Sequence, residues 1–171
     1  MRDTCSISQV RMFIKDRDIF LSRIRQIATR WNTIIIFLDS GRMAGRSHVE
    51  AALFHAFRAH SEGSMISSSI EMETLLFASG SRQIVHGMAF GVHEGANASY
   101  LCLCPDMPAA IEDIRECCSP ADDEDWESLP SEKEALLCSL FSITPEELAI
   151  VGPERIKELV LERVALLEVY R

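Results

Sequence analysis

Residues 79–84 form the stretch of the chain whose residue types are best suited to hold a ligand. Gly80 is typical of a residue that ends a helix in left-handed geometry, and Ser81 can cap a second helix beginning at Arg82. Backbone N–H groups at such a helix start can hold a phosphate, Arg82 adds charge, and Gln83 can hydrogen-bond a base or a ribose. An ordinary corner between two helices would have the same residues, so chemistry alone leaves both interpretations open.

The cysteines and histidines follow no familiar metal or disulfide spacing. The six cysteines stand at positions 5, 102, 104, 117, 118 and 138, with no C-x-x-C pair, and the five histidines do not cluster. Buried, unbridged thiols are therefore expected. The sequence has no G-x-S-x-G, Walker A or H-E-x-x-H motif. We predict no catalytic residue, no metal ligand and no cofactor.

The net charge of −9 argues against a nucleic-acid partner at first sight, but the charge is unevenly distributed. Residues 1–60 hold ten Lys or Arg and five Asp or Glu, a balance of +5, whereas residues 61–171 hold seven and twenty-one, a balance of −14. A basic first third can present a local positive face, although an accidental drift of surface charge would give the same numbers.

Length and composition indicate a globular chain. With 171 residues, of which 47% are hydrophobic and 25% charged, one domain over residues 1–171 is expected. The longest apolar run, residues 34–38, is far too short to span a bilayer, and no apolar signal segment follows Met1. We expect a cytoplasmic protein without a membrane partner.

Three stretches predict the strands of a small sheet. Residues 5–14 alternate loosely, residues 33–38 are a continuous β-branched run, and residues 98–104 are apolar on both faces and therefore internal. Around them the pattern predicts about seven helices, with Ser68 and Glu71 in capping-box spacing before the central one. The stretches that favour a helix, eight when the two short central ones are counted separately, are 16–31, 47–60, about 70–80, about 82–91, 108–118, 131–141, a short one from 144 and a last one from 153. The predicted class is α+β, with a small mixed β-sheet flanked by helices in a single domain.

The last helix has two apolar faces. A broad face contains Ile156, Leu159, Val160, Val164, Leu167 and Tyr170, and a second stripe contains Leu161, Ala165 and Val169. Such a helix is either deeply buried or buried on one face and bound to a partner on the other. We predict a partner surface at Leu161, Ala165, Glu168 and Val169.

Residues 70–84, IEMETLLFASGSRQI, resemble the signature of the smallest core subunit of KEOPS, a family that includes the p53-related-protein-kinase-binding proteins. Archaeal members carry Met-Glu, a short apolar run and then Ala-Ser-Gly-x-Arg-Gln-Ile. Here these segments are Met72-Glu73, residues 74–77 and residues 78–84. Residues 160–168, VLERVALLE, are similar to the last helix of that family.

The resemblance implies a non-catalytic accessory subunit. It would bind the single-stranded CCA 3′ end of tRNA and dock on a small kinase-like ATPase, supporting threonylcarbamoylation of the adenosine next to the anticodon. Single-stranded ends suit such recognition because unstacked bases expose their edges and faces. The expected RNA-binding residues are Ser79, Gly80, Arg82, Gln83, Ile84 and Arg46.

Two alternatives stay open. The first is a protein-interaction module that regulates the kinase-like subunit without binding RNA, and the Arg82-Gln83 corner distinguishes it from the RNA-binding interpretation. The second is a small hydrolase with its nucleophile in the Ser79-Gly80-Ser81 turn, which has no general base beside it in the sequence.

Overall fold

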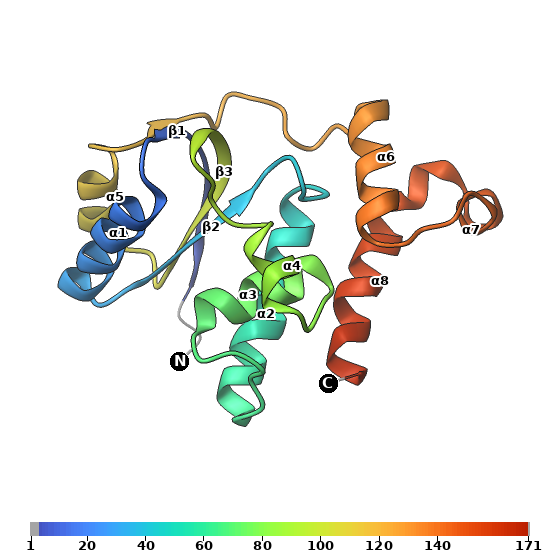
Figure 1. Cartoon of the computed structure of the whole chain (residues 1–171), viewed down its shortest axis with the longest axis horizontal. Helices are drawn as coiled ribbons and strands as arrows, with labels where there is room; N and C mark the ends of the chain where they lie inside the picture. Colours follow the sequence, from blue (N-terminus) through green and yellow to red (C-terminus); the bar gives the residue numbers. More distant parts are fainter. Residues whose placement is uncertain (1–3, 171) are drawn as a thin grey trace. The chain divides into compact units, whose positions relative to one another are not determined.

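The computed structural model describes residues 4–170 and contains two compact units, each built from two separate parts of the chain. Unit 1 comprises the chain up to Asp39 together with Gly91–Asp125, and unit 2 comprises Ser40–Phe90 together with the chain from Trp126 onwards. Unit 1 contains the sheet, and unit 2 contains the helices that form the candidate site (Figure 1). A single domain over residues 1–171 stays a prediction.

The sheet of unit 1 has the strand order β2-β3-β1-β4. Its strands are β1 (Ser6–Ile14), β2 (Ile34–Asp39), β3 (Gly95–Cys104) and the short β4 (Ser119–Pro120). The α+β class is confirmed, and β3 is internal as predicted. The sheet is antiparallel rather than mixed in all its described pairings, because β3 lies between β1 and β2 and runs opposite to both.

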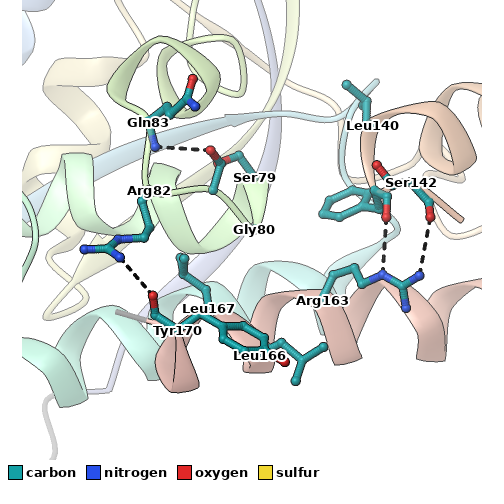
Figure 2. A pocket seen from close by; sticks show the side chains of 12 residues that line it. Ser79, Gly80, Arg82, Gln83, Leu140, Ser142, Arg163, Leu166, Leu167 and Tyr170 are labelled. Atoms are coloured by element: carbon teal, nitrogen blue, oxygen red, sulfur yellow. Dashed lines mark hydrogen bonds between the residues drawn. The ribbon is translucent and has the colours of Figure 1, made fainter.

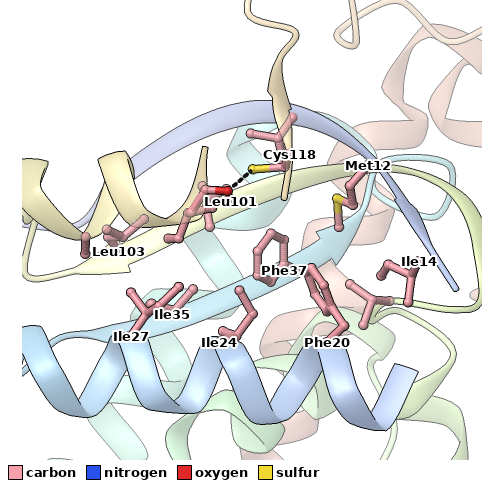
Figure 3. Packing of buried hydrophobic residues seen from close by; sticks show 14 residues of the cluster. Met12, Ile14, Phe20, Ile24, Ile27, Ile35, Phe37, Leu101, Leu103 and Cys118 are labelled. Carbon is pink, nitrogen blue, oxygen red and sulfur yellow. Dashed lines mark hydrogen bonds between the residues drawn. The ribbon is translucent and has the colours of Figure 1, made fainter. Parts of the chain in front are cut away.

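One face of the sheet is covered by α1 (Arg17–Trp31) and α5 (Pro108–Ile114) (Figure 1). Asp16 caps α1 by accepting the Ile19 N–H at 3.0 Å. Alternate residues of each strand point to these helices, as the period of two in a strand requires. Figure 3 shows the packing of Met12, Ile14, Phe20, Ile24, Ile27, Ile35, Phe37, Leu101 and Leu103.

Cys5 and Cys104 form a disulfide between residues 99 positions apart. The prediction of unbridged thiols is therefore wrong for this pair. Ser6 pairs with Leu103 in the β1–β3 register, which brings the preceding Cys5 opposite Cys104. Sequence spacing could not reveal this pair, since the strand register creates it. The unbridged thiols among residues 4–170 belong to Cys102, Cys117, Cys118 and Cys138.

Unit 2 is organised around α2 (Arg46–Glu62), which packs against both α3 (Ile70–Ser79) and α8 (Ile156–Val169). The remaining elements are α4 (Ile84–Met88), α6 (Ser131–Leu140), α7 (Pro145–Val151) and a short 3-10 helix, η1 (Pro153–Arg155). Apart from the buried His48, the inward positions of α2 are small or apolar, which permits close helix contacts. They are Val49, Ala52, Leu53, Ala56 and Ala59, all buried.

Neither a membrane-spanning helix nor a metal cluster occurs in the described part of the chain. No helix within residues 4–170 is long and apolar enough to cross a bilayer. In the same residues, no three or more His, Cys, Asp or Glu side chains are grouped to hold a metal ion.

Candidate functional site

The predicted corner begins at the end of α3. Gly80 has a φ of 60°, its N–H donates to Phe77 O at 3.0 Å, and the Ser81 N–H donates to Leu76 O at 3.2 Å. This pair of hydrogen bonds is a Schellman motif, and it confirms Gly80 as the predicted residue that ends the helix. At the other end of α3 the predicted capping box is wrong by one residue. Ser69, rather than Ser68, accepts the Met72 N–H, at 3.2 Å.

The second helix of the corner, α4, begins at Ile84 instead of Arg82. The predicted cap at Ser81 is confirmed only in part. Its Oγ accepts a backbone N–H, that of Gln83 at 3.1 Å, but this bond lies before α4 and does not cap the helix. Arg82 and Gln83 therefore lie exposed in the linker between the helices. A helix of five residues supplies little dipole, so only the side chains of this corner could hold an anion strongly.

A pocket of about 470 Å³ opens beside this corner, within unit 2. Its walls come from the α3–α4 linker, from the end of α6 and from one face of α8 (Figure 2). The described lining residues are Ser79, Gly80, Ser81, Arg82, Gln83, Leu140, Phe141, Ser142, Arg163, Leu166, Leu167 and Tyr170.

The described lining of the pocket has two cationic side chains although the chain as a whole is acidic, and Glu147 balances the charge of one of them, Arg163. Of the described lining residues, Arg82 and Arg163 are cationic and none is a carboxylic acid. Arg82 is exposed, and one of its five N–H donors meets Tyr170 O at 3.0 Å (Figure 2). Arg82 therefore supplies the positive charge of this pocket and most of its available N–H donors.

Arg163 fixes the wall opposite Arg82. Its Nε donates to Phe141 O at 3.2 Å, and its two terminal nitrogens donate to the Glu147 carboxylate at 2.8 and 2.7 Å. This bidentate pair raises the pKa of Arg163 and lowers the pKa of Glu147, mainly through the hydrogen bonds themselves. Both groups therefore stay charged, and the turn after α6 is held against α8.

The outer face of α8 is a second candidate surface. Leu161 is half-buried, Ala165 is exposed and Val169 is 73% exposed, so the core of unit 2 leaves most of the predicted stripe uncovered. Glu168 beside it is already engaged. Its carboxylate lies 2.8 Å from His55 Nδ1 and 3.3 Å from Arg58 Nε, which ties α8 to α2.

A family model described as kinase binding protein CGI-121 matches residues 17–168. This chain belongs to the CGI-121 family. A search of curated proteins finds no match. The matched span of this CGI-121 protein contains the α3–α4 corner and α8 up to Glu168, whereas Val169 and Tyr170 lie beyond it.

The structure brings together four of the six residues predicted to bind RNA. Ser79, Gly80, Arg82 and Gln83 line the pocket. Ile84 is 44% exposed at the start of α4 but does not line it. Arg46 lies at the start of α2, where its Nε donates to Glu50 at 3.2 Å, and it is not a lining residue either.

Sequence reasoning missed the α8 side of this pocket in the CGI-121 chain. Tyr170 was predicted to face the core, but it is 68% exposed at the pocket, because α8 ends at Val169 and Tyr170 follows it. Arg163, Leu166, Leu167 and Tyr170 recur at helical spacing, so one helix face joins them. That periodicity was the available signal.

His48 supports the corner from inside. This fully buried side chain accepts the Ala44 N–H at Nδ1, at 3.0 Å, so Nε2 carries the proton and donates to Ala78 O at 2.8 Å. Burial lowers the pKa of His48 to about 4, the hydrogen bond to Ala78 opposes the shift, and nearby Lys133 adds to it. The neutral imidazole thus fixes the backbone next to Ser79.

Proposed function

We propose that this CGI-121 family member is the smallest core subunit of KEOPS, of the archaeal type. In this role it is a non-catalytic accessory subunit. It binds the 3′ CCA end of tRNA and docks on the kinase-like ATPase subunit, and it thereby supports threonylcarbamoylation of the adenosine next to the anticodon elsewhere in the complex.

The observation that carries the RNA part is the composition of the α3–α4 pocket. A chain of net charge −9 here places the exposed Arg82 at a pocket of about 470 Å³ whose described lining has no carboxylic acid, while the second lining arginine, Arg163, is paired with Glu147 just outside the lining. Nucleic-acid binding by an acidic protein needs such a local concentration of positive charge. The same pocket combines the corner residues with those of α8.

The side chains suit an unpaired strand end. Arg82 is exposed and can bind a phosphate, and Gln83 beside it can hydrogen-bond a base edge or a ribose hydroxyl. The exposed ring of Tyr170 offers a face on which a base can stack. A base in a duplex has neither its face nor its pairing edge available, so these contacts favour a single-stranded end.

The docking part rests on α8 and on the family, whose description is that of a kinase-binding protein. Leu161, Ala165 and Val169 form an apolar stripe that unit 2 leaves largely uncovered. Apolar residues surrounded by charged ones are typical of protein interfaces. We assign the kinase-like partner to this stripe, with Glu168 at its edge.

A protein-interaction module that binds the kinase-like subunit without RNA is the second candidate. The family description and the α8 stripe would suit it equally, since neither involves the pocket. The pocket therefore distinguishes the two proposals.

A gel-shift series with the purified chain tests RNA binding. Full-length tRNA should bind, and tRNA that lacks its CCA end should bind at least tenfold more weakly. The Arg82→Ala variant should lose a similar factor, because a hydrogen bond to a charged group contributes about 1.5–3 kcal/mol. With one or two phosphate contacts, the logarithm of the binding constant should fall by about 0.7 per contact for each decade of salt.

Arg25→Ala is the matched control, because Arg25 is exposed on α1 and does not line the pocket. It should bind tRNA like the wild-type chain. Equal affinity for tRNA with and without the CCA end, together with unchanged binding by folded Arg82→Ala, would exclude the RNA role and leave the interaction module.

A further inference from the structure

The outer face of α2 has an exposed aromatic side chain near its middle. Phe54 is 61% exposed, and its ring centroid lies 5.3 Å from that of the half-buried His55. Aromatic residues are enriched in the cores of protein interfaces, whereas a single exposed apolar residue is also common on ordinary surfaces. The neighbours of Phe54 therefore decide whether this ring belongs to an interface.

Charged residues extend from Phe54 in both directions at intervals of four. The row is Arg46, Glu50, Phe54, Arg58 and Glu62, and all five side chains are exposed. Residues four apart are neighbours on the surface of a helix, so the row follows the outer side of α2. Each charge before Phe54 is matched by the opposite charge at the same distance after it. The row is therefore its own complement.

A two-fold axis at Phe54 would use this complementarity. When two identical helices pack antiparallel about such an axis, a residue before Phe54 faces the residue at the same distance after Phe54 in the second copy. Glu50 then faces Arg58 of the second copy, and Arg46 faces its Glu62. The symmetry makes each pair occur twice, and no like charges meet within the row.

The apolar residues of this face obey the same symmetry. Ala51 and Phe57 lie three residues before and after Phe54, and both are half-buried. The axis would place the small Ala51 against the larger Phe57 of the second copy and the two Phe54 rings against each other. Small side chains opposite large ones let two helices approach closely, and a pair of aromatic rings adds to the contact.

We propose that the outer face of α2 is an interface between two copies of this chain, packed antiparallel about a two-fold axis at Phe54. Charge complementarity selects a second copy as the occupant, because the row of charges matches itself under this axis. The interface concerns unit 2 and does not depend on RNA binding or on the kinase-like partner. Its failure would therefore leave the proposed function unaffected.

Few existing contacts oppose this packing. In the single chain Arg46 pairs with Glu50 at 3.2 Å, and Arg58 pairs with Glu62 at 2.9 Å and with Glu168 at 3.3 Å. Exposed ion pairs contribute little, so replacing them by pairs between copies costs little. The net charge of −9 on each copy opposes association, but this repulsion is screened beyond about 8 Å at physiological salt.

Sedimentation of the purified chain tests the dimer. A single helix face is small beside the roughly 800 Å² per partner of a stable complex, so we expect a weak dimer. The average mass should rise from one chain towards two between about 1 µM and about 1 mM. A chain that stays monomeric over this whole range would overturn the proposal.

Phe54→Ala tests the centre of the interface. It should raise the dissociation constant of the dimer at least tenfold, because it removes an aromatic contact from both copies at once. Ile150→Ala is the matched control, since Ile150 is 85% exposed on α7 and outside the face, and it should dimerise like the wild type. An unchanged dissociation constant for Phe54→Ala would place the interface elsewhere.

Charge reversal tests the antiparallel arrangement. Glu50→Arg sets an arginine against Arg58 of the second copy, and Arg58→Glu sets a glutamate against its Glu50. Each variant alone should be monomeric where the wild type dimerises, because like charges then oppose each other across the interface. An equimolar mixture should form heterodimers, because the new arginine faces the new glutamate and the unchanged Arg58 faces the unchanged Glu50.

Recovery on mixing distinguishes charge pairing from misfolding, since two misfolded chains would not restore each other. Thermal melting of each variant checks its fold directly, and the Phe54→Ala test does not involve Arg58 or its pair with Glu168. Variants that dimerise alone as well as the wild type does, or folded variants whose mixture stays monomeric, would overturn the antiparallel interface.

Discussion

Two buried polar side chains hold the ends of α3. The Glu73 carboxylate accepts the Ile66 N–H at 3.1 Å and the Ser67 N–H at 2.9 Å, which anchors the segment before the helix. His48 bonds Ala78 O at the other end. Each of them satisfies backbone groups that a helix end and its flanking loop would otherwise leave unpaired. The position of the corner therefore depends on residues that no ligand touches.

Protonation of His48 should destabilise the fold in mild acid. Its folded pKa of about 4 lies below the ordinary 6.5, so the unfolded chain binds the proton more tightly. The contribution of His48 is complete above pH 6.5 and is lost as the pH falls from 6.5 towards 4, by roughly 2–3 kcal/mol at pH 4.5. Urea unfolding at pH 7.5 and 4.5 measures this loss.

His48→Gln removes the titration and should lose less unfolding free energy between the two pH values than the wild-type chain. His93→Gln, at an exposed histidine of unit 1, should behave like the wild type. If His48→Gln and the wild type lose equal free energy on acidification, the carboxylates alone cause the acid sensitivity and the role of His48 is refuted.

At the residue scale, the sequence predicts what local geometry dictates. The sequence identifies Gly80 as the residue that ends α3, because a left-handed backbone at a helix end favours glycine, and the φ of Gly80 is 60°. The sequence does not identify the supporting contact of His48, because the acceptor Ala78 is 30 positions away and no periodicity marks a buried polar contact. The capping serine was misplaced because Ser67, Ser68 and Ser69 are equivalent in sequence, and only the backbone selects Ser69.

Among the elements, α8 has a buried apolar face and, on the opposite side, an apolar stripe that is largely exposed. The predicted core face is confirmed for Ile156, Leu159, Val160, Val164 and Leu167, which are buried. Amphipathic periodicity fixes such a face because burial is the main stabilising term. Whether the outer stripe binds a partner depends on a molecule that the sequence of this chain does not contain.

The start of α4 illustrates what periodicity cannot locate. Five residues give too little pattern to fix a boundary, and α4 is held by packing. A side chain at buried Gly87 would place its Cβ 3.1 Å from Leu76 Cδ2, so the glycine allows α4 to approach α3 closely. That contact between helices, rather than the cap predicted at Ser81, determines the shape of the corner.

A charge on the outer stripe of α8 should block docking without unfolding the chain. Ala165 is exposed, so Ala165→Arg leaves the new charge in water and should change the melting temperature little. In a complex with the kinase-like subunit the arginine would be desolvated and unpaired, which costs several kcal/mol of binding. Co-purification with that subunit and thermal melting of the free variant measure both effects.

The neighbouring Val164 gives the contrasting control. It is fully buried, so Val164→Arg should lower the melting temperature sharply whatever the partner does. An Ala165→Arg variant that melts as early would mean that the stripe belongs to the core. One that is stable and still co-purifies would move the docking surface elsewhere on the chain.

For the whole molecule, charge is segregated rather than simply acidic. The net charge of −9 coexists with a pocket in which Arg82 is exposed, Arg163 is paired with Glu147, and no described lining residue is a carboxylic acid. Long-range repulsion between an acidic chain and RNA is screened within about 8 Å at physiological salt, so local contacts decide binding. Composition correctly placed the protein among globular chains but could not show where its cations gather, because residues from three helices and their linkers build the pocket.

The Cys5–Cys104 disulfide is expected to contribute to global stability. It links residues 99 positions apart, and closing so long a loop reduces the entropy of the unfolded chain, with an expected stabilisation of about 5 kcal/mol. Adding reductant should therefore lower the unfolding free energy of the wild-type chain by about that amount. The Cys5→Ala/Cys104→Ala double variant should start at the lower value and should not respond to reductant.

Cys102→Ala, at an unbridged cysteine of the same strand, should keep the full response. Unfolding in urea with and without reductant, together with a thiol count in denaturant, measures all three. Six titratable thiols in the unreduced wild-type chain, with no effect of reductant on its unfolding, would show that the two sulfurs lie opposite each other without a bond.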